Sequence, residues 1–190
     1  MKKSEVEHVL RAAGDITGER QFIIIGSQSI HAKHPDRFAG ATISLELDLF
    51  AKNHPERTEQ LNAIGQESRF HETYGYYADP VDSTTAVLPK GWQGRLINLP
   101  VTETNGVAGL CLDPHDLLIS KYVAHREKDI DFNREVMASG VVDAERLLAL
   151  VDITPVDETA RRRMRGYIEH DRRLADSAPA KADLAGNTDK

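Results

Sequence analysis

Two acidic residues near the start of the chain have the spacing of a metal-binding pair. Glu46 and Asp48 are two residues apart within residues 42–50, where apolar side chains alternate with other types. This alternation predicts a β-strand, and residues two apart on a strand point to the same face. Two carboxylates on one face repel each other unless a cation lies between them, which favours a divalent metal that carries a nucleoside triphosphate. The alternative is an edge strand with a solvated acidic face.

A second segment offers groups that suit a phosphate. The apolar run over 21–25 predicts a buried strand, and Gly26-Ser27 follows it before a short predicted helix over 28–33. Such a turn can present backbone N–H groups and a hydroxyl to a phosphate. Ser27 can equally be the N-cap of the helix, and the two roles are compatible. Together the two segments suggest phosphoryl or nucleotidyl transfer.

The elements that must position these residues have an α+β pattern. Ser4 and Glu7 form a predicted capping box for a first helix, which Gly14 is expected to end. A helix is predicted over 55–68, and Asp79-Pro80 is expected to open a turn. Strands are predicted over 95–100 and 106–112, joined through 102–105. With the two strands above, they give a small mixed sheet of four or five strands.

The rest of the chain is predicted to be helical. Asp113-Pro114 is a strong helix start, because Asp caps a helix and Pro suits its first position. Further helices are predicted over 128–139, 143–151 and 155–174, and the composition from 176 onward is typical of disorder. We therefore expect an α/β core over 1–112, a helical region packed on it over 113–175, and a disordered tail over 176–190.

The composition limits the class of protein. The chain has 190 residues, 40% of them hydrophobic, and a formal net charge of −6, so there is no global basic field for nucleic acid. The single Cys111 excludes an internal disulfide and a cysteine-based zinc site. The start does not have the pattern of a signal peptide, and no apolar stretch has the length of a membrane span. A cytoplasmic protein without a membrane partner is expected.

Four short motifs in order resemble those of the nucleotidyltransferase superfamily. They are Gly26-Ser27, Glu46-Leu47-Asp48, the segment from Asp116 to Lys121, and the segment from Arg126 to Asp131. The group that includes AbiEii-type toxins and the related DUF6036 proteins is the most similar, and the segments 70–77 and 88–92 also resemble a DUF6036-like subgroup. The resemblance implies a polymerase-β-like fold, in which a small mixed sheet with packed helices is followed by more helices.

The resemblance also implies an activity and roles for residues. It implies Mg²⁺-dependent transfer of a nucleoside monophosphate from a nucleoside triphosphate to an RNA such as tRNA, or to a protein. It also suggests a toxin-like role with a cognate antitoxin as partner. The roles carried over are triphosphate binding by Gly26 and Ser27, Mg²⁺ binding by Glu46 and Asp48, phosphate contact by Lys121, nucleotide binding by Arg126, and a polar catalytic cluster completed by Asp129 with Asp131 behind it. Asp48 or Asp129 is the candidate base.

Several of these residues also have simpler interpretations. Lys121 can be a surface lysine, and Asp129 can merely cap a helix. The aromatic run over 70–77 can stack a base or belong to the core, and the arginines of 161–173 can bind a nucleic acid or form a solvated helix face. The chain has Glu46 where the superfamily usually has Asp, and no third carboxylate falls on a predicted strand. The alternative function is therefore a catalytically inactive nucleotide-binding or protein-interaction module that retains the fold.

Overall fold

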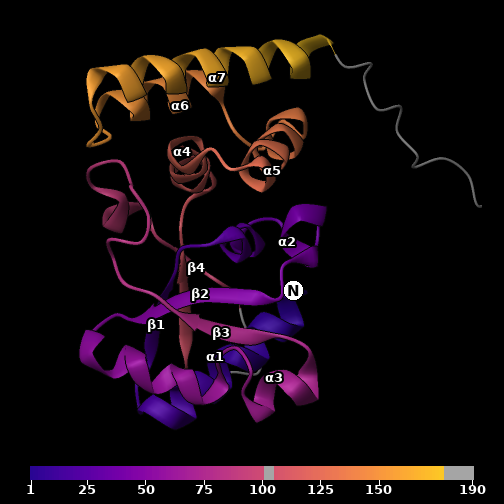
Figure 1. The fold of residues 1–190 in the computed structure, drawn as a ribbon, viewed down its shortest axis with the longest axis vertical. Helices are drawn as coiled ribbons and strands as arrows, with labels where there is room; N and C mark the ends of the chain where they lie inside the picture. The colour runs from indigo at the N-terminus through magenta and orange to yellow at the C-terminus, as the bar shows by residue number, and fades with distance from the viewer. Residues whose placement is uncertain (101–104, 178–190) are drawn as a thin grey trace, which may run out of the picture.

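The computed structural model describes residues 1–100 and 105–177, which form a mixed sheet with helices on both faces (Figure 1). The strand order is β3-β2-β1-β5-β4. Strand β1 runs antiparallel to β2 and parallel to β5, while β2 is parallel to β3 and β4 is antiparallel to β5. This architecture confirms the predicted α+β class with a mixed sheet. The strands of the described residues are β1 (Gln21–Ile24), β2 (Glu46–Ala51), β3 (Tyr77–Pro80), β4 (Ile97–Asn98) and β5 (Ala108–Cys111).

The two faces of the sheet bury different sets of apolar residues. Leu47, Leu49 and Ala78 belong to the core that lies against helix α1 (Lys3–Thr17), the 3₁₀-helix η2 (Pro55–Ile64) and helix α3 (Arg69–Tyr74). Ile23, Ile25 and Leu110 belong to the second core, which contains the C-terminal helices. Because successive strand residues point to opposite faces, Glu46 and Asp48 are directed toward that second side.

The predicted C-terminal helical region is present and has two layers. Helices α4 (Pro114–Ala124) and α5 (Glu127–Ala138) lie nearer the sheet, and α6 (Ala144–Asp152) and α7 (Glu158–Ser177) lie outside them (Figure 1). The helix start at Asp113-Pro114 is confirmed, because the Asp113 side chain accepts the backbone N–H of His115 at 2.9 Å. Three short elements complete the described chain, namely η1 (Ser27–Ala32), α2 (Ala39–Ile43) and η3 (Trp92–Arg95).

The ends of the first helix differ from the prediction. Helix α1 begins at Lys3, and Glu5 rather than Glu7 accepts the backbone N–H of Lys2 at 2.7 Å, so Ser4 is not the cap. The helix also continues through Gly14 to Thr17 and ends at Gly18, whose φ is 68°. Gly14 serves packing instead, because a Cβ built there would overlap the side chain of Val107.

Other predicted elements are shorter or divided. The strand predicted over 42–50 begins only at Glu46, because 39–43 form α2. The helix predicted over 55–68 is the 3₁₀-helix η2, which ends at Ile64, and Ser68 instead caps α3. The strands predicted over 95–100 and 106–112 are reduced to β4 and β5, and residues 102–104 of their predicted connection lie outside the described part. Residues 176–177 belong to α7, whereas the rest of the predicted tail, 178–190, also lies outside it.

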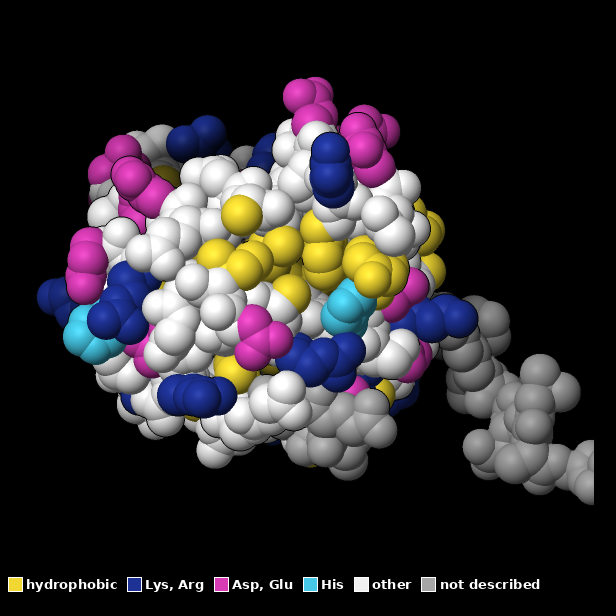
Figure 2. All heavy atoms as spheres, turned by 90° about the horizontal axis from the view of Figure 1, so that it is seen from below, with side chains coloured by type: hydrophobic (Ala, Val, Ile, Leu, Met, Phe, Trp, Pro, Cys, Tyr) yellow, Lys and Arg dark blue, Asp and Glu magenta, His cyan; other side chains and the backbone are white. Residues whose placement is uncertain are grey.

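The aromatic run divides between two surroundings. Phe70, Tyr74 and Tyr76 pack against His8 of α1, with ring centroids 5.0, 4.6 and 5.9 Å away. Seen from the side of α1 and α3, hydrophobic side chains form a band among charged ones (Figure 2). Phe70 and Tyr76 are partly buried against the core, which supports the core and sheet-edge interpretation, whereas Tyr74 is 50% exposed. Tyr77 lies on β3 and faces the other way. Among the described helices, none has the length and apolar character needed to cross a membrane.

Candidate active site

Three carboxylates from two neighbouring strands share one face of the sheet. Glu46 and Asp48 lie on β2, and the parallel pairing of β2 with β3 aligns Glu46 with Tyr77 and Asp48 with Asp79. Aligned residues of adjacent strands lie about 5 Å apart and point to the same side. The structure therefore brings the predicted pair together and adds Asp79 to it.

The prediction that Asp79 lies in a turn is wrong. Asp79-Pro80 has turn composition, but the two residues end strand β3. Because β3 is the outermost strand beside β2, Pro80 can lack an N–H donor there without breaking a ladder. One signal was available in the sequence, since Tyr77 and Asp79 alternate with the buried Ala78 as Glu46 and Asp48 alternate with the buried Leu47.

The carboxylates of this face are poorly compensated. Burial, followed by the charges of Asp79 and Glu46, raises the pKa of Asp48 from 3.8 to about 6. Burial and the charge of Glu46 likewise raise the pKa of Asp79. Within the described residues no hydrogen bond or ion pair reaches either of these two carboxylates. Glu46 differs, because Tyr77 donates its hydroxyl to it at 3.3 Å and Lys128 approaches it at 3.4 Å.

Gly26 lies against the Asp48 carboxylate, and a residue with a side chain would not fit at this position. A Cβ built on Gly26 would lie 2.7 Å from Asp48 Cγ and closer still to its carboxylate oxygen. The backbone of Gly26 is extended, so the requirement is one of space and not of conformation. Ser27 follows as the first residue of η1, and both residues line the same pocket as Asp48.

The predicted cations come from the helical side and converge on one buried acid. Lys121 of α4 approaches Asp129 of α5 at 3.0 Å, and Arg126 between the two helices contacts the same carboxylate at 2.7 Å. Asp129 is fully buried, and its two oxygens accept from these cations. It also caps α5, as the simpler interpretation predicts, because it accepts the backbone N–H of Arg126 at 3.3 Å. Burial lowers the pKa of Lys121, although the Asp129 charge opposes the shift. Asp129 thus lies behind the pocket and holds two side chains that line it.

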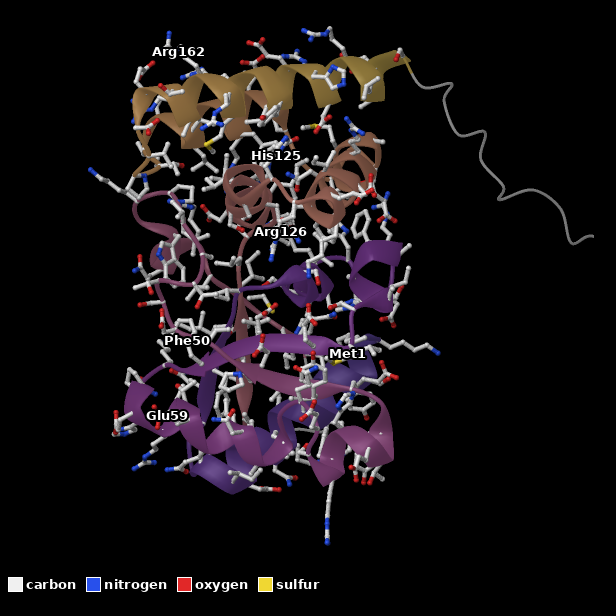
Figure 3. The ribbon with its side chains drawn as sticks, viewed as in Figure 1. Met1, Phe50, Glu59, His125, Arg126 and Arg162 are labelled. Carbon is white, nitrogen blue, oxygen red and sulfur yellow. The ribbon has the colours of Figure 1, made fainter. Side chains whose placement is uncertain are left out.

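A pocket of about 1250 Å³ separates the carboxylates from the cations. In Figure 3, Arg126 lies where the helical layer faces the sheet, whereas Arg162 lies on the outer surface of α7. The pocket is lined by the predicted residues Gly26, Ser27, Glu46, Asp48, Lys121, Arg126 and Asp131, together with Asp79, Tyr77 and Lys128, which the sequence analysis did not assign. Asp129 is not part of its lining. The site therefore places a hard oxygen donor set opposite three cationic side chains.

The donor set suits Mg²⁺ better than a metal that needs a complete protein cage. No three His, Cys, Asp or Glu side chains of the described residues converge as such a cage. Mg²⁺ keeps several waters and is usually held by one or two carboxylates together with substrate phosphates. Asp48 and Asp79 offer two adjacent carboxylates without protein partners, so the residues present fit this ion.

The comparison with protein families agrees with this chemistry. A family model described as a nucleotidyltransferase of unknown function (DUF6036) matches residues 4–172. The chain belongs to the DUF6036 family. No curated protein and no solved structure matches the sequence. The DUF6036 match includes the whole pocket lining, from Ile25 to Glu135, and all of the described helices that support it except the ends of α1 and α7.

Proposed function

We propose that this DUF6036 protein transfers a nucleoside monophosphate from a nucleoside triphosphate to a hydroxyl group in a Mg²⁺-dependent reaction. The observation that carries the proposal is the alignment of Asp48 with Asp79 across two parallel strands, with no ion pair to either carboxylate from the described residues. Keeping two adjacent carboxylates uncompensated costs stability, and such arrangements occur where charge serves a ligand. If these carboxylates served only the stability of the fold, a lysine or arginine would be expected to form an ion pair with them.

The other groups of the pocket suit a triphosphate. Gly26 and Ser27 offer backbone N–H groups and a hydroxyl beside Asp48, and Lys121 and Arg126 offer positive charge from the opposite wall. Asp129 orients both cations, which reduces the freedom they lose when phosphate oxygens bind. Asp48 and Asp79 would hold the Mg²⁺, and Glu46, which Tyr77 and Lys128 already contact, lies beside them. When bound, Mg²⁺ would neutralise negative charge on the phosphates and on the departing pyrophosphate.

The transfer itself is one displacement. The acceptor oxygen bonds to the α-phosphorus as the bond from that phosphorus to the pyrophosphate oxygen breaks. The acceptor proton must go to a base, and Asp48 or Asp129 was the candidate. Both oxygens of Asp129 are engaged by Lys121 and Arg126, whereas the Asp48 carboxylate has no hydrogen bond or ion pair among the described residues. We therefore assign this role to Asp48.

The test is transfer of label from each of the four α-³²P-labelled triphosphates in the presence of Mg²⁺, total RNA and cell extract. Label in a macromolecule is expected with the wild type and is expected to be lost with Asp48→Asn and Asp79→Asn. Glu59→Gln is the matched control, because Glu59 is exposed and lies far from the pocket (Figure 3).

Two results would contradict the proposal. Label that persists in both aspartate variants would show that these carboxylates do not act. Mg²⁺-dependent binding of a triphosphate without any transfer would favour the catalytically inactive nucleotide-binding module. The reason to consider this module is that Glu46 stands where the superfamily usually has Asp. A toxin-like role with a cognate antitoxin is a further proposal, tested by whether expression of the wild type, and not of Asp48→Asn, arrests growth.

A further inference from the structure

Among the described residues, the cations that line the pocket have protein partners, whereas several of its carboxylates do not. Five carboxylates and three cations line it. Each cation already has a protein carboxylate as its partner, since Lys121 and Arg126 share Asp129, and Lys128 approaches Glu46. The carboxylates are Glu46, Asp48, Asp79, Asp131 and Glu135.

Asp131 is the unpartnered carboxylate that the proposed reaction does not use. Among the described residues, Asp48, Asp79 and Asp131 have no hydrogen bond or ion pair to their side chains. Asp48 and Asp79 are assigned to the metal above. Asp131 lies in the first half of α5, is exposed to solvent and lines the same pocket. An exposed carboxylate at the mouth of a substrate pocket suits a cationic group on the substrate.

Exposed apolar side chains line the same pocket. Ile43 is 75% exposed and Leu45 is 52% exposed, which makes them two of the most exposed large hydrophobic residues of the described chain. The segment that carries them is fixed to α5, because Glu135 accepts the backbone N–H of Ala39 at 2.8 Å. Apolar surface beside a free carboxylate matches a polypeptide that carries a basic residue.

An RNA acceptor fits these charges poorly. Binding of a nucleic acid backbone depends on lysines and arginines that neutralise phosphates. The pocket cations of the described residues are already paired, and a bound triphosphate would compete for them. The arginine-rich helix α7 belongs to the outer layer of helices, and Arg162 lies on its outer surface, away from the pocket (Figure 3). A polyanion at the pocket mouth would therefore meet Asp131 and Glu46, while each cation of the described pocket lining already has a carboxylate partner.

We infer that the acceptor is a serine, threonine or tyrosine hydroxyl of a polypeptide that carries a lysine or arginine close to it, and that Asp131 binds this basic residue. The inference rests on the proposed function. In the reaction, the hydroxyl oxygen bonds to the α-phosphorus, pyrophosphate leaves, and the hydroxyl proton passes to Asp48. The polypeptide gains a phosphodiester-linked nucleotide.

The experiment offers three acceptors to the protein with Mg²⁺ and the α-labelled triphosphates. Two are peptide pools with a fixed serine, threonine or tyrosine, flanked by Arg and Lys in one pool and by Asp and Glu in the other. The third is total tRNA. Labelling of the basic pool is expected to exceed that of the acidic pool and of tRNA. Asp131→Asn is expected to lower kcat/KM for the basic pool by about two- to fivefold, mainly through KM, as for an exposed ion pair.

Charge reversal and a control separate recognition from folding. Asp131→Lys is expected to shift the preference toward the acidic pool, which a merely misfolded variant could not do. Glu59→Gln is expected to leave the preference unchanged. Label in tRNA but not in the peptide pools would overturn the inference and leave the proposed function standing. Equal labelling of both pools would also overturn it, and absence of transfer to any acceptor would overturn the proposed function with it.

Discussion

The Cα of Gly26 lies against the carboxylate of Asp48, and a Cβ at position 26 would be 2.7 Å from Asp48 Cγ. The turn after β1 and the carboxylate on β2 are therefore fitted to each other, although Gly26 and Asp48 are 22 positions apart in the sequence. Any side chain at position 26 must displace Asp48, because the three atoms nearest to a Cβ there all belong to the Asp48 side chain. This contact ties the proposed phosphate-binding turn to the proposed metal ligand.

Gly26→Ala is expected to abolish label transfer while the protein remains folded. The added methyl group must push Asp48 out of its place, and a displacement of about 1 Å in a reacting group can cost about 100-fold in rate. The measurement is transfer from labelled triphosphate together with the thermal unfolding midpoint. Gly94→Ala is the control, because a Cβ there meets nothing within 4 Å. Wild-type activity in Gly26→Ala would show that Asp48 need not stay where it lies.

Asp48→Asn is expected to stabilise the metal-free protein near pH 7.5. Between about pH 4 and about pH 6 the folded chain keeps a proton on Asp48 that the unfolded chain releases, so the free energy of unfolding falls as the pH rises through this window. The asparagine removes this penalty, which is about 3 kcal/mol at most. Urea unfolding at pH 7.5 and at pH 4 measures it, and the gain should vanish at the lower pH. A variant that is less stable at both values would contradict this.

Magnesium is expected to stabilise the wild type and to have little effect on Asp48→Asn. A ligand that binds only the folded state raises stability by RT ln(1 + [L]/Kd), which is about 2.7 kcal/mol at 100 times Kd. The thermal unfolding midpoint is measured with and without MgCl₂, using NaCl of equal ionic strength as the reference. Equal shifts in the wild type and in Asp48→Asn would place magnesium binding elsewhere.

Asp129→Leu is expected to destabilise the protein by about 3 kcal/mol, since it leaves Lys121 buried without its partner. The double variant Lys121→Met with Asp129→Leu is expected to recover most of that stability, because an apolar pair can replace a buried ion pair. Nucleotide binding should remain weak in the double variant. Recovery of both properties would show that Lys121 does not contact the triphosphate.

Arg126→Ala is expected to weaken triphosphate binding about 10- to 150-fold, which corresponds to the loss of one charge-assisted hydrogen bond of about 1.5–3 kcal/mol. Equilibrium binding of a non-hydrolysable triphosphate analogue measures it without turnover. The matched control is Arg162→Ala on the outer surface of α7. An equal loss in both variants would indicate a general effect of net charge.

Local sequence signals predicted the two segments at the centre of the site. The acidic pair Glu46 and Asp48 and the turn Gly26-Ser27 were predicted from alternation and residue type, and the structure places all four on one pocket. The helix start at Asp113 was also predicted, because its cap is made by residues adjacent in sequence. Such features depend on neighbours within a few residues.

Features that depend on distant partners were missed. Strand β3 has four residues and exists through its pairing with β2, so Asp79-Pro80 was interpreted from its turn composition alone. Gly14 was predicted to end a helix, but it lies inside α1, where the side chain of Val107, just before β5, leaves no room for a Cβ. The burial of Asp129 behind two cations depends on the packing of α4 against α5, which no local pattern reports.

The charged residues of the two pocket walls come from different parts of the sequence. In the described structure, the carboxylates at the proposed metal site come from strands β2 and β3, and the pocket cations come from α4, α5 and the residues between them. Mutations in the C-terminal half can thus change the nucleotide or the acceptor while the metal ligands stay constant. A lineage with this architecture can diversify its targets through one half of the gene and conserve its reaction through the other.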